Sequence, residues 1–582
     1  MNSSSNKRTT RALLTLTLGS LAAAPSWAGG GTTGVTERIS FTEDGSSVSE
    51  NCADPAISAD GRFVAFSTEE ALLAADDNGR SDIYVQDRET GLLVCASVNY
   101  WGQYVDGDAM YPSISANGRC VAFETTADAF GFDVNGTTDV IFVDLDEGVP
   151  RMASGTNGSI VSGNNTSRAP SLSADGRYVA FQTAASDILP GDTNTKWDIY
   201  VHDMLTGNVS RASIGTLGES NDNSFNPSIS ANGLRVAFES LASNLIFGDA
   251  NGERDIFVHR FDGGFTQLMT RSAVGDQSDN SSHHAEISDD GIIVLYRSEA
   301  SNLVANDLNG QSDAFYGIVG QQGAFLVSAS LAGTPANGST THVNLSPDGR
   351  YAAFRNSGNN LTPSSSGIAD VYLRDLETLS TWLVSRPTGA TLVANHGSSA
   401  PAVSENGAHV AFLSNATNLD LSDTNSVTDI YVRTTIEDAT PYCDTMITVA
   451  GCEPSITSIG ISSASADAGF NIVATDVAPD KPSLLFYGFS GRKSLPFMGG
   501  THCVKGSTKR SLILRSVPVG AGPCDGVLTF DMNAFAAGAI PGNPQLALSV
   551  VGQTVNAQFW GRDPGSAFGV FLTNAIEYVV GP

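Results

Sequence analysis

The hydrophobic and polar positions of this chain recur in a fixed pattern. A nine-residue phrase, Ser58-Ala59-Asp60-Gly61-Arg62-Phe63-Val64-Ala65-Phe66, places a polar turn before a short apolar run. Seven copies occur at intervals of 57 or 58 residues, and they begin at Ser58, Ser115, Ser173, Ser230, Ser288, Ser346 and Ser404. A period of this size predicts a repeat architecture in which each unit is one supersecondary element.

One repeat reads as four short strands. In the fourth copy, 227–230 and 234–239 flank an Ala-Asn-Gly turn, and 255–258 and 265–272 follow after loops. Asn and Gly tolerate the backbone angles of tight turns. Four antiparallel strands without helical periodicity are typical of a propeller blade, and such blades must stack around an axis to bury both faces. The sequence therefore predicts an all-β protein with a seven-bladed β-propeller at 35–436.

The ends of the repeat array predict how the ring closes. The seventh unit has three strands and then runs into Thr434-Thr435-Ile436-Glu437-Asp438, without a fourth strand. The segment 35–40, before the first repeat, has a suitable strand pattern. We expect it to complete the last blade, because pairing the two ends removes an exposed sheet edge.

Charge narrows the classes of partner. The formal net charge is −30, which argues against nucleic acid or an anionic membrane as a partner. The acidity is compatible with cation binding, and it is also a general device for solubility.

The first 28 residues have the pattern of a secretory signal peptide. Lys7, Arg8 and Arg11 precede the apolar run 12–24, which is too short to span a bilayer, and Ser26-Trp27-Ala28 offers small residues before a cleavage point. We expect an exported protein that is secreted, periplasmic or on the cell surface, with 29–34 as a flexible lead-in. No transmembrane segment is expected.

The repeat ends before the last part of the chain. Residues 437–455 read as a linker and 456–582 as a smaller all-β domain, a β-sandwich or jelly roll. Its strand candidates are 470–474, 484–487, 512–516, 527–530 and 554–560. Local spacing in an export context favours the disulfides Cys443–Cys452 and Cys503–Cys524. Cys52, Cys95 and Cys120 remain, and Cys120 occupies a core position of its repeat.

The repeat resembles a known family. The phrase at 173–181, followed by Asp-Ile-Tyr-Val at 198–201, is similar to the TolB-type, WD40-like β-propeller repeat. The resemblance implies a propeller, in a family whose members scaffold partners, bind glycans or gate peptidases. The pieces 486–488, 499–504, 524–526 and 559–564 resemble a C-terminal domain of secreted bacterial proteins, which implies export or surface placement and no known chemistry.

A second repeated phrase, Asp-x-Asn-x-x-x-Asp, precedes the third strand of six units. Its residues are Asp76, Asn78 and Asp82; Asp133, Asn135 and Asp139; Asp192, Asn194 and Asp198; Asp249, Asn251 and Asp255; Asp307, Asn309 and Asp313; and Asp423, Asn425 and Asp429. Oxygen ligands in a tight loop suit Ca²⁺. The same residues also build Asx-turns, in which a side chain bonds to a nearby backbone amide, so both interpretations stay open.

Long polar loops are expected on one face of the propeller, where function tends to lie. On that face, His284, Glu286, His342 and Asn344 form a polar cluster at the mouth, either a site for Zn²⁺ or a similar ion, or simply solvated side chains. An aromatic cluster suited to a glycan comprises Tyr100, Trp101, Tyr104 and Tyr111.

Three functions remain from the sequence. The first is an exported scaffold that binds a protein or a glycan through its long-loop face. The second is a structural or cell-surface protein without a discrete ligand. The third is a hydrolase with acids in the propeller mouth. A serine-hydrolase triad is not expected, because 488–492 lacks the final Gly of the nucleophile motif. No catalytic residue is assigned.

Overall fold

The structure is a computed structural model. It describes residues 35–435, apart from 129, 132, 216–217, 306, 331–332, 363–364, 366, 389–392 and 421, together with 440–442, 452, 454–459, 470–489, 492–497, 500–504, 509–518, 524–540, 544–549, 553–562 and 570–580. The predicted signal peptide and lead-in, 1–34, lie outside the described residues. No described helix is long and apolar enough to cross a membrane.

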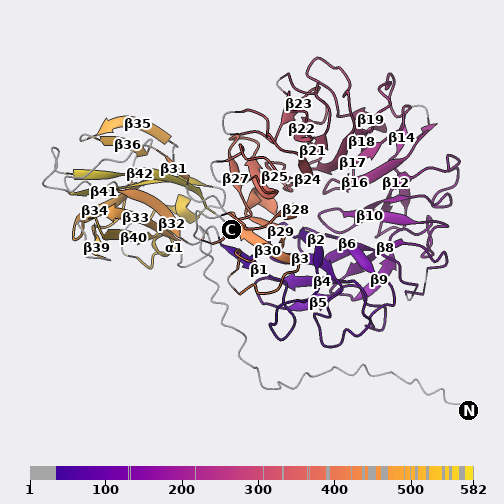
Figure 1. The fold of residues 1–582 in the computed structure, drawn as a ribbon, viewed down its shortest axis with the longest axis horizontal. Helices are drawn as coiled ribbons and strands as arrows, with labels where there is room; N and C mark the ends of the chain where they lie inside the picture. Colours follow the sequence, from indigo (N-terminus) through magenta and orange to yellow (C-terminus); the bar gives the residue numbers. More distant parts are fainter. Residues whose placement is uncertain are drawn as a thin grey trace, which may run out of the picture. The chain divides into compact units, whose positions relative to one another are not determined.

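The first part of the chain forms a β-propeller. Within 35–435 as described, seven four-stranded antiparallel sheets follow one another, and we number them blades 1 to 7. Figure 1 shows them arranged around a central axis, with inner strands such as β2, β6, β10, β16, β24 and β28 toward the middle.

The strands of blades 1 to 4 run from the inside outward in chain order. They are β2 (Cys52–Ile57), β3 (Phe63–Thr68), β4 (Asp82–Asp87) and β5 (Leu93–Cys95); β6 (Ala109–Ile114), β7 (Cys120–Thr125), β8 (Asp139–Asp144) and β9 (Val149–Met152); β10 (Ser167–Leu172), β11 (Tyr178–Thr183), β12 (Asp198–Asp203) and β13 (Val209–Arg211); and β16 (Ser224–Ile229), β17 (Arg235–Ser240), β18 (Asp255–Arg260) and β19 (Phe265–Leu268). A small hairpin, β14 (Ile214–Gly215) and β15 (Gly218–Glu219), joins blades 3 and 4.

Blades 5 to 7 continue the series. Their strands are β20 (Ser282–Ile287), β21 (Ile293–Ser298), β22 (Asp313–Ile318) and β23 (Ala324–Leu326); β24 (Thr340–Leu345), β25 (Tyr351–Asn356), β26 (Asp370–Asp375) and β27 (Thr381–Leu383); and β28 (Ser398–Val403), β29 (His409–Ser414), β30 (Asp429–Thr434) and β1 (Thr36–Arg38). A short 3₁₀ turn, η1 (Glu405–Gly407), joins β28 and β29.

The pairing of β1 with β30 confirms the predicted role of the N-terminal strand. Thr36 lies opposite Arg433, and Arg38 lies opposite Tyr431. The Arg38 side chain is buried within 3.6 Å of both Asp423 and Asp429. The outer strand of blade 7 thus comes from the opposite end of the array.

The repeated phrase builds the hairpin between the two inner strands of each blade. In blade 1 the Ser58 hydroxyl donates to Asp60 Oδ1 at 2.5 Å, and the backbone N–H of Phe63 donates to Ser58 Oγ at 2.9 Å. Gly61 supplies the positive φ of 73° that this turn requires. Serine, aspartate and glycine therefore recur because each satisfies one need of the turn.

The turn glycine also brings neighbouring blades together. A Cβ placed on Gly118 would lie 2.2 Å from Cδ2 of Phe63, in the preceding blade. The same contact closes the array, where Gly61 of blade 1 lies against His409 of blade 7. The backbone N–H of Glu405 also donates to the carbonyl of Ala59 at 2.8 Å, so the last sheet packs on the first.

The described residues beyond 435 form further sheets. One has the order β31 (Thr440–Tyr442), β42 (Val570–Val579), β41 (Thr554–Arg562), β34 (Pro482–Gly488) and β37 (Lys509–Arg510), with β38 (Leu514–Arg515) also on β34. The other has the order β32 (Ser455–Ile459), β33 (Asn471–Val477), β40 (Gly526–Asp531) and β39 (Val517–Pro518). A hairpin of β35 (Arg492–Phe497) and β36 (Gly500–Val504), the helix α1 (Met532–Ala536) and the turn η2 (Leu546–Ser549) complete these elements.

The two larger sheets share one hydrophobic core. Ile472 and Phe530 of one sheet cluster with Leu485 and Phe559 of the other. Two sheets that bury one common face are the packing expected of a sandwich. The segment 437–455, expected to be a linker, contributes β31 to this region.

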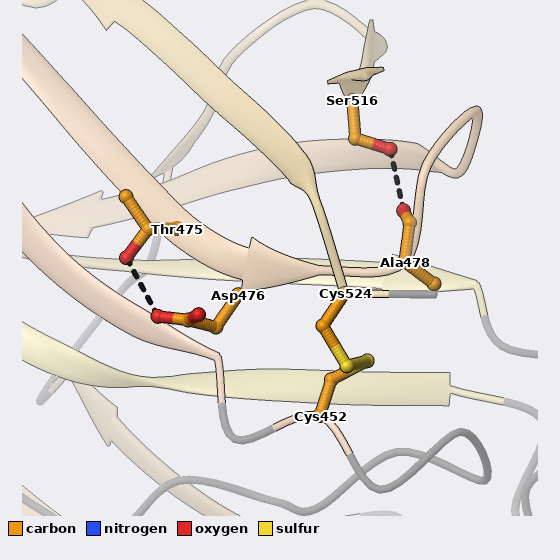
Figure 2. Close-up of a disulfide and its surroundings, with 6 residues drawn as sticks. All are labelled: Cys452, Thr475, Asp476, Ala478, Ser516 and Cys524. Carbon is orange, nitrogen blue, oxygen red and sulfur yellow. Dashed lines mark hydrogen bonds between the residues drawn. A yellow bond between two sulfur atoms is a disulfide. The ribbon is translucent and has the colours of Figure 1, made fainter. Parts of the chain in front are cut away.

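The predicted disulfide pairs Cys443–Cys452 and Cys503–Cys524 are wrong. Cys452 is bonded to Cys524, with Cα atoms 5.4 Å apart and 72 residues of chain between them (Figure 2). Cys503 is also disulfide-bonded. Cys452 and Cys524 precede β32 and β40, which both pair with β33, so strand topology brings their ends together. Proximity in sequence was the wrong guide.

Beside the disulfide, the chain is held by local hydrogen bonds. The Ser516 hydroxyl donates to the carbonyl of Ala478 at 2.8 Å, and the Thr475 hydroxyl donates to Asp476 at 3.0 Å (Figure 2). The Cys452–Cys524 bond joins positions 72 residues apart, and closing a loop of this length stabilises a domain by roughly 4 kcal/mol in the chain-entropy treatment. Cys52, Cys95 and Cys120 are free thiols, and Cys120 is buried as expected.

The contact at the turn glycine gives a stability prediction. We expect Gly118→Ala to destabilise the propeller by about 2–4 kcal/mol, because alanine resists a φ of 72° and its Cβ would overlap the Phe63 ring. Gly136→Ala is the matched control, since Gly136 has a φ of 65° and no atom within 4 Å of its added Cβ. It should cost only about 1 kcal/mol. Urea unfolding measures both, and equal losses would contradict a role for the blade contact.

Candidate functional site

The aspartate loops form the same hydrogen-bonded turn in successive blades. In blade 2, Asn135 Nδ2 donates to Asp139 Oδ2 at 3.1 Å and to the carbonyl of Gly163 at 2.7 Å. Asn135 Oδ1 accepts from the backbone N–H of Thr137 at 2.6 Å. Equivalent bonds from the Asn amide to the second Asp occur at Asn78, Asn194, Asn251 and Asn309. The Asn thus joins its own loop to the segment that leads into the next blade.

The second Asp of each loop is buried, and in blades 1 to 5 it accepts hydrogen bonds on both oxygens. In blade 5, Asp313 Oδ2 accepts from Asn309 and Oδ1 accepts from the Ser328 hydroxyl, both at 2.5 Å. Burial raises the pKa of Asp313 to about 7. It likewise raises the pKa of Asp139 to about 7 and that of Asp82 to about 6. These carboxyl groups hold the third and fourth strands together.

Two blades add an arginine to the loop. In blade 3, Arg211 lies 3.3 Å from Asp192 and 2.8 Å from Glu219. In blade 7 the buried Arg38 takes the corresponding place beside Asp423 and Asp429. The first Asp can also accept from a tyrosine of the third strand, as Asp192 does from Tyr200 at 2.9 Å. In blade 6 the lone Asp370 accepts from the Ser385 hydroxyl at 2.8 Å.

These contacts describe Asx-turns in which most polar atoms have protein partners, although one oxygen each of Asp133, Asp192, Asp423 and Asp429 is buried without a hydrogen-bond partner among the described residues. Within the part of the chain that is described, no group of three or more His, Cys, Asp or Glu side chains has an arrangement suited to a metal ion. The predicted loop residues do come together within each blade, and each loop is separate from the others along the array.

The propeller mouth is built on a backbone irregularity of the inner strands. In six blades the register shifts near the start of the inner strand, at a residue with a positive φ of 44–52°. These residues are Asp54, Tyr111, Ala169, Asn226, His284 and Ala400. A non-glycine residue seldom adopts this conformation, so neighbouring contacts must hold it in place.

For Ala169, Asn226 and His284, a side chain from the second strand of the preceding blade supplies that contact. The backbone N–H of Ala169 donates to Glu124 at 2.7 Å, and that of His284 donates to Glu239 at 2.6 Å. Blade 5 carries Arg297 at the position that Glu239 occupies in blade 4. An arginine side chain cannot accept a hydrogen bond from the backbone N–H of the next inner strand. In the next inner strand the register shifts one position earlier, between Thr340 and His342, so that His342 lies opposite Arg355 and has no positive φ. The side chain of one blade and the backbone of the next are thus coupled.

The predicted cluster of His284, Glu286, His342 and Asn344 divides into two pairs. The exposed imidazoles of His284 and His342 approach each other, with ring centroids 6.4 Å apart. Glu286 instead accepts from the Ser228 hydroxyl at 3.1 Å, and Asn344 accepts from the backbone N–H of Val403 at 2.8 Å. The histidines face the mouth, whereas the other two join adjacent blades.

The acids around the mouth have opposite electrostatic environments. Burial raises the pKa of Glu124 and that of Glu286 to about 7. Burial acts in the same direction on Glu239, but hydrogen bonds from His283, Asn226 and the His284 backbone lower its pKa to about 2. Arg254 also lies 2.9 Å from Glu239. Glu239 is therefore a buried, ionised carboxylate with its own cationic partners.

Sequence reasoning missed the second-strand residues of the mouth. They occupy one column of the repeat, directly after the conserved-looking aromatic position: Ser67, Glu124, Gln182, Glu239, Arg297, Arg355 and Leu413. Reading the repeats as aligned columns would have shown that this position varies in charge, while the residue before it stays aromatic and the residue after it stays polar and uncharged. That variation was the available signal.

The aromatic residues expected to suit a glycan lie in different places. Tyr100 and Trp101 are exposed and meet edge to face with centroids 6.0 Å apart, in the turn between β5 and β6. Tyr111 is exposed at the mouth, and Tyr104 is half-buried. Trp197 and Phe225 pack with centroids 6.4 Å apart, and Arg254 lies over the Phe225 ring.

Comparison with known proteins bears on the fold. No protein-family profile and no curated protein matches the chain. Among solved structures, an oligogalacturonate lyase in complex with manganese is 14% identical with a TM-score of 0.42, over 70% of this chain and 97% of that one. An oligogalacturonate lyase from Vibrio parahaemolyticus has 14% identity and a TM-score of 0.43, over 70% and 98%. A putative TolB from Agrobacterium tumefaciens has 14% and 0.31, over 66% and 90%. At these identities and TM-scores, the matches assign neither a family nor an activity to this chain.

Proposed function

We propose that this protein is an exported scaffold, with a closed seven-bladed propeller at 35–436, that binds a protein or a glycan at the mouth of its long-loop face. The signal peptide at 1–28 directs export, and the region after 455 is a β-sandwich. The Cys452–Cys524 disulfide supports this placement, because such bonds persist in oxidising compartments.

The observation that carries the proposal is the contrast between framework and mouth. The hairpin with its glycine recurs in all seven blades, and the aspartate turn recurs in six with the same residue types. The inner-strand position at the mouth does not recur: it is Asp54, Tyr111, Ala169, Asn226, His284, His342 and Ala400. A repeat that conserves its scaffold but varies one solvent-facing ring has the form of a recognition surface.

The geometry of the mouth supports the same proposal. Tyr111 and His284 are both exposed, although each has a left-handed backbone conformation that costs of order 1 kcal/mol or more. Exposed side chains on a backbone fixed from behind are pre-organised, and binding then orders few groups.

This proposal predicts which substitutions weaken ligand binding. Residues 29–582 would be tested against immobilised glycan and protein panels, alongside a Tyr111→Ala/His284→Ala variant and a Leu205→Ala variant. Leu205 is exposed in the turn after β12, on the other face. We expect the mouth variant to lose about tenfold or more in affinity, or about 1.4 kcal/mol, and Leu205→Ala to bind as the unchanged protein does. Equal retention by all three, or no retained ligand, would contradict the proposal.

We also propose that the aspartate loops are structural turns. The support is that Asn135 uses both atoms of its amide within the protein. Asn135→Ala should then cost about 2–3 kcal/mol from three lost hydrogen bonds, equally in chelator and in millimolar Ca²⁺. Thermal unfolding with Mg²⁺ as the control ion measures this. A calcium-specific rise in melting temperature that Asn135→Ala removes would instead make these loops calcium sites.

A further inference from the structure

Two arginines at the mouth have little negative charge near them, although the protein is strongly acidic. Arg297 Nη1 lies 3.9 Å from Glu299, and its Nε is buried without a hydrogen-bond partner among the described residues. Arg355 donates to the Thr341 hydroxyl at 2.7 Å and to the carbonyl of Ser398 at 3.2 Å, both neutral groups. Several other arginines meet carboxylates at 2.6–2.9 Å, as in the pairs of Arg119 with Asp144 and Arg177 with Asp203, whereas Arg374, like Arg355, donates to neutral groups.

His284 and His342 lie close enough to these arginines for the guanidinium charges to act on their imidazoles. Burial, His284 and the positive charges of Arg355 and Arg297 together lower the pKa of His342 to about 4. Burial, Arg297 and other cations lower the pKa of His284 despite nearby Glu239. Both imidazoles are thus neutral at pH 7 and can each donate one N–H. Arg297, Arg355, His284 and His342 form one group of donors from blades 5 and 6.

The nearby acids do not neutralise this group. Glu239 is held by Arg254 at 2.9 Å and lies 3.7 Å from His283, and Glu286 turns to Ser228. Two guanidinium groups oppose the binding of a metal cation between the histidines, so the charge of the site does not favour the Zn²⁺ considered from the sequence. The same charges favour an oxyanion, because arginine offers paired donors that match a carboxylate.

We propose that Arg297, Arg355, His284 and His342 form an anion site that takes a carboxylate group of the ligand at the propeller mouth. This rests on the proposed function and adds the chemical class of the ligand. The half-buried aromatic pair of Trp197 and Phe225, with Arg254 over the Phe225 ring, lies in the neighbouring blades 3 and 4.

The test compares acidic ligands with their neutral counterparts. Calorimetric titration of residues 29–582 would use citrate as the small probe, a uronic-acid trisaccharide against a neutral trisaccharide, and a glutamate tripeptide against a glutamine tripeptide. We expect saturable binding of an acidic member and at least tenfold weaker binding of its neutral counterpart. The two acidic oligomers distinguish a sugar acid from an acidic peptide as the source of the carboxylate.

Single substitutions then test whether these arginines form the anion site. Arg297→Gln should weaken binding of the acidic probe about tenfold, since one charge-assisted hydrogen bond is lost. Arg260→Gln is the control of equal charge, because Arg260 pairs with Asp262 at the far end of β18, away from the mouth. It should change binding less than twofold. Arg355→Gln serves as a second variant, with circular dichroism to check that the fold survives the loss of its bonds to Thr341 and Ser398.

Three results would overturn the proposal: no saturable binding of any acidic probe, equal binding of acidic and neutral probes, or equal effects of Arg297→Gln and Arg260→Gln. A neutral ligand that depends on Tyr111 but not on Arg297 would leave the mouth as a binding surface and remove only the anion site.

Discussion

The structure depends on the contact between each hairpin glycine and a side chain of the preceding blade. That side chain is Phe63, Cys120, Tyr178, Arg235, Ile293, Tyr351 or His409, and in each case a Cβ on the facing glycine would lie 3.2 Å or less from it. The side chains differ widely in chemistry, so the constraint is one of space at the glycine. The ring closes because the last of them, His409, meets the first glycine, Gly61.

A second set of contacts converts this packing into a rigid ring. Backbone N–H groups at Leu172, Ile229 and Ile287 donate to the serine hydroxyl of the preceding blade at 3.0–3.1 Å. Strand β1 then pairs with β30, so the two ends of the array share one sheet. Because each inner strand is fixed by its neighbour, the residue at its mouth end can vary without loss of the fold. The same arrangement tolerates His284 and Tyr111 in a strained conformation.

How much the sequence predicted follows from the range of each interaction. The hairpins, the order of strands and the pairing of β1 rest on local patterns and on the missing fourth strand, and all were accessible. The left-handed residues and the acceptors behind them were not, because a contact such as Glu239 with the backbone of His284 joins positions 45 residues apart in different blades. The disulfide prediction was wrong for the same reason, since the order of the strands, and not the spacing in sequence, brings Cys452 and Cys524 together. Aligning the repeats as columns is the step that connects these positions.

The aspartate loops and the mouth show two uses of charge in one acidic protein. In the loops, carboxyl groups are buried against asparagine, serine and, in blades 3 and 7, arginine, so most of their oxygens have partners within the protein. At the mouth the relation is reversed: Arg297 is partly buried, its Nε has no hydrogen-bond partner among the described residues, and the carboxylate of Glu299 is 3.9 Å away. Removing solvent from the Arg297 guanidinium without a close counter-charge costs free energy. No carboxylate of the described residues lies closer to it than Glu299 to offset that cost. An anionic ligand would supply that compensation, which is why the charge of the mouth, rather than the more numerous aspartates, gives the sharper indication of function.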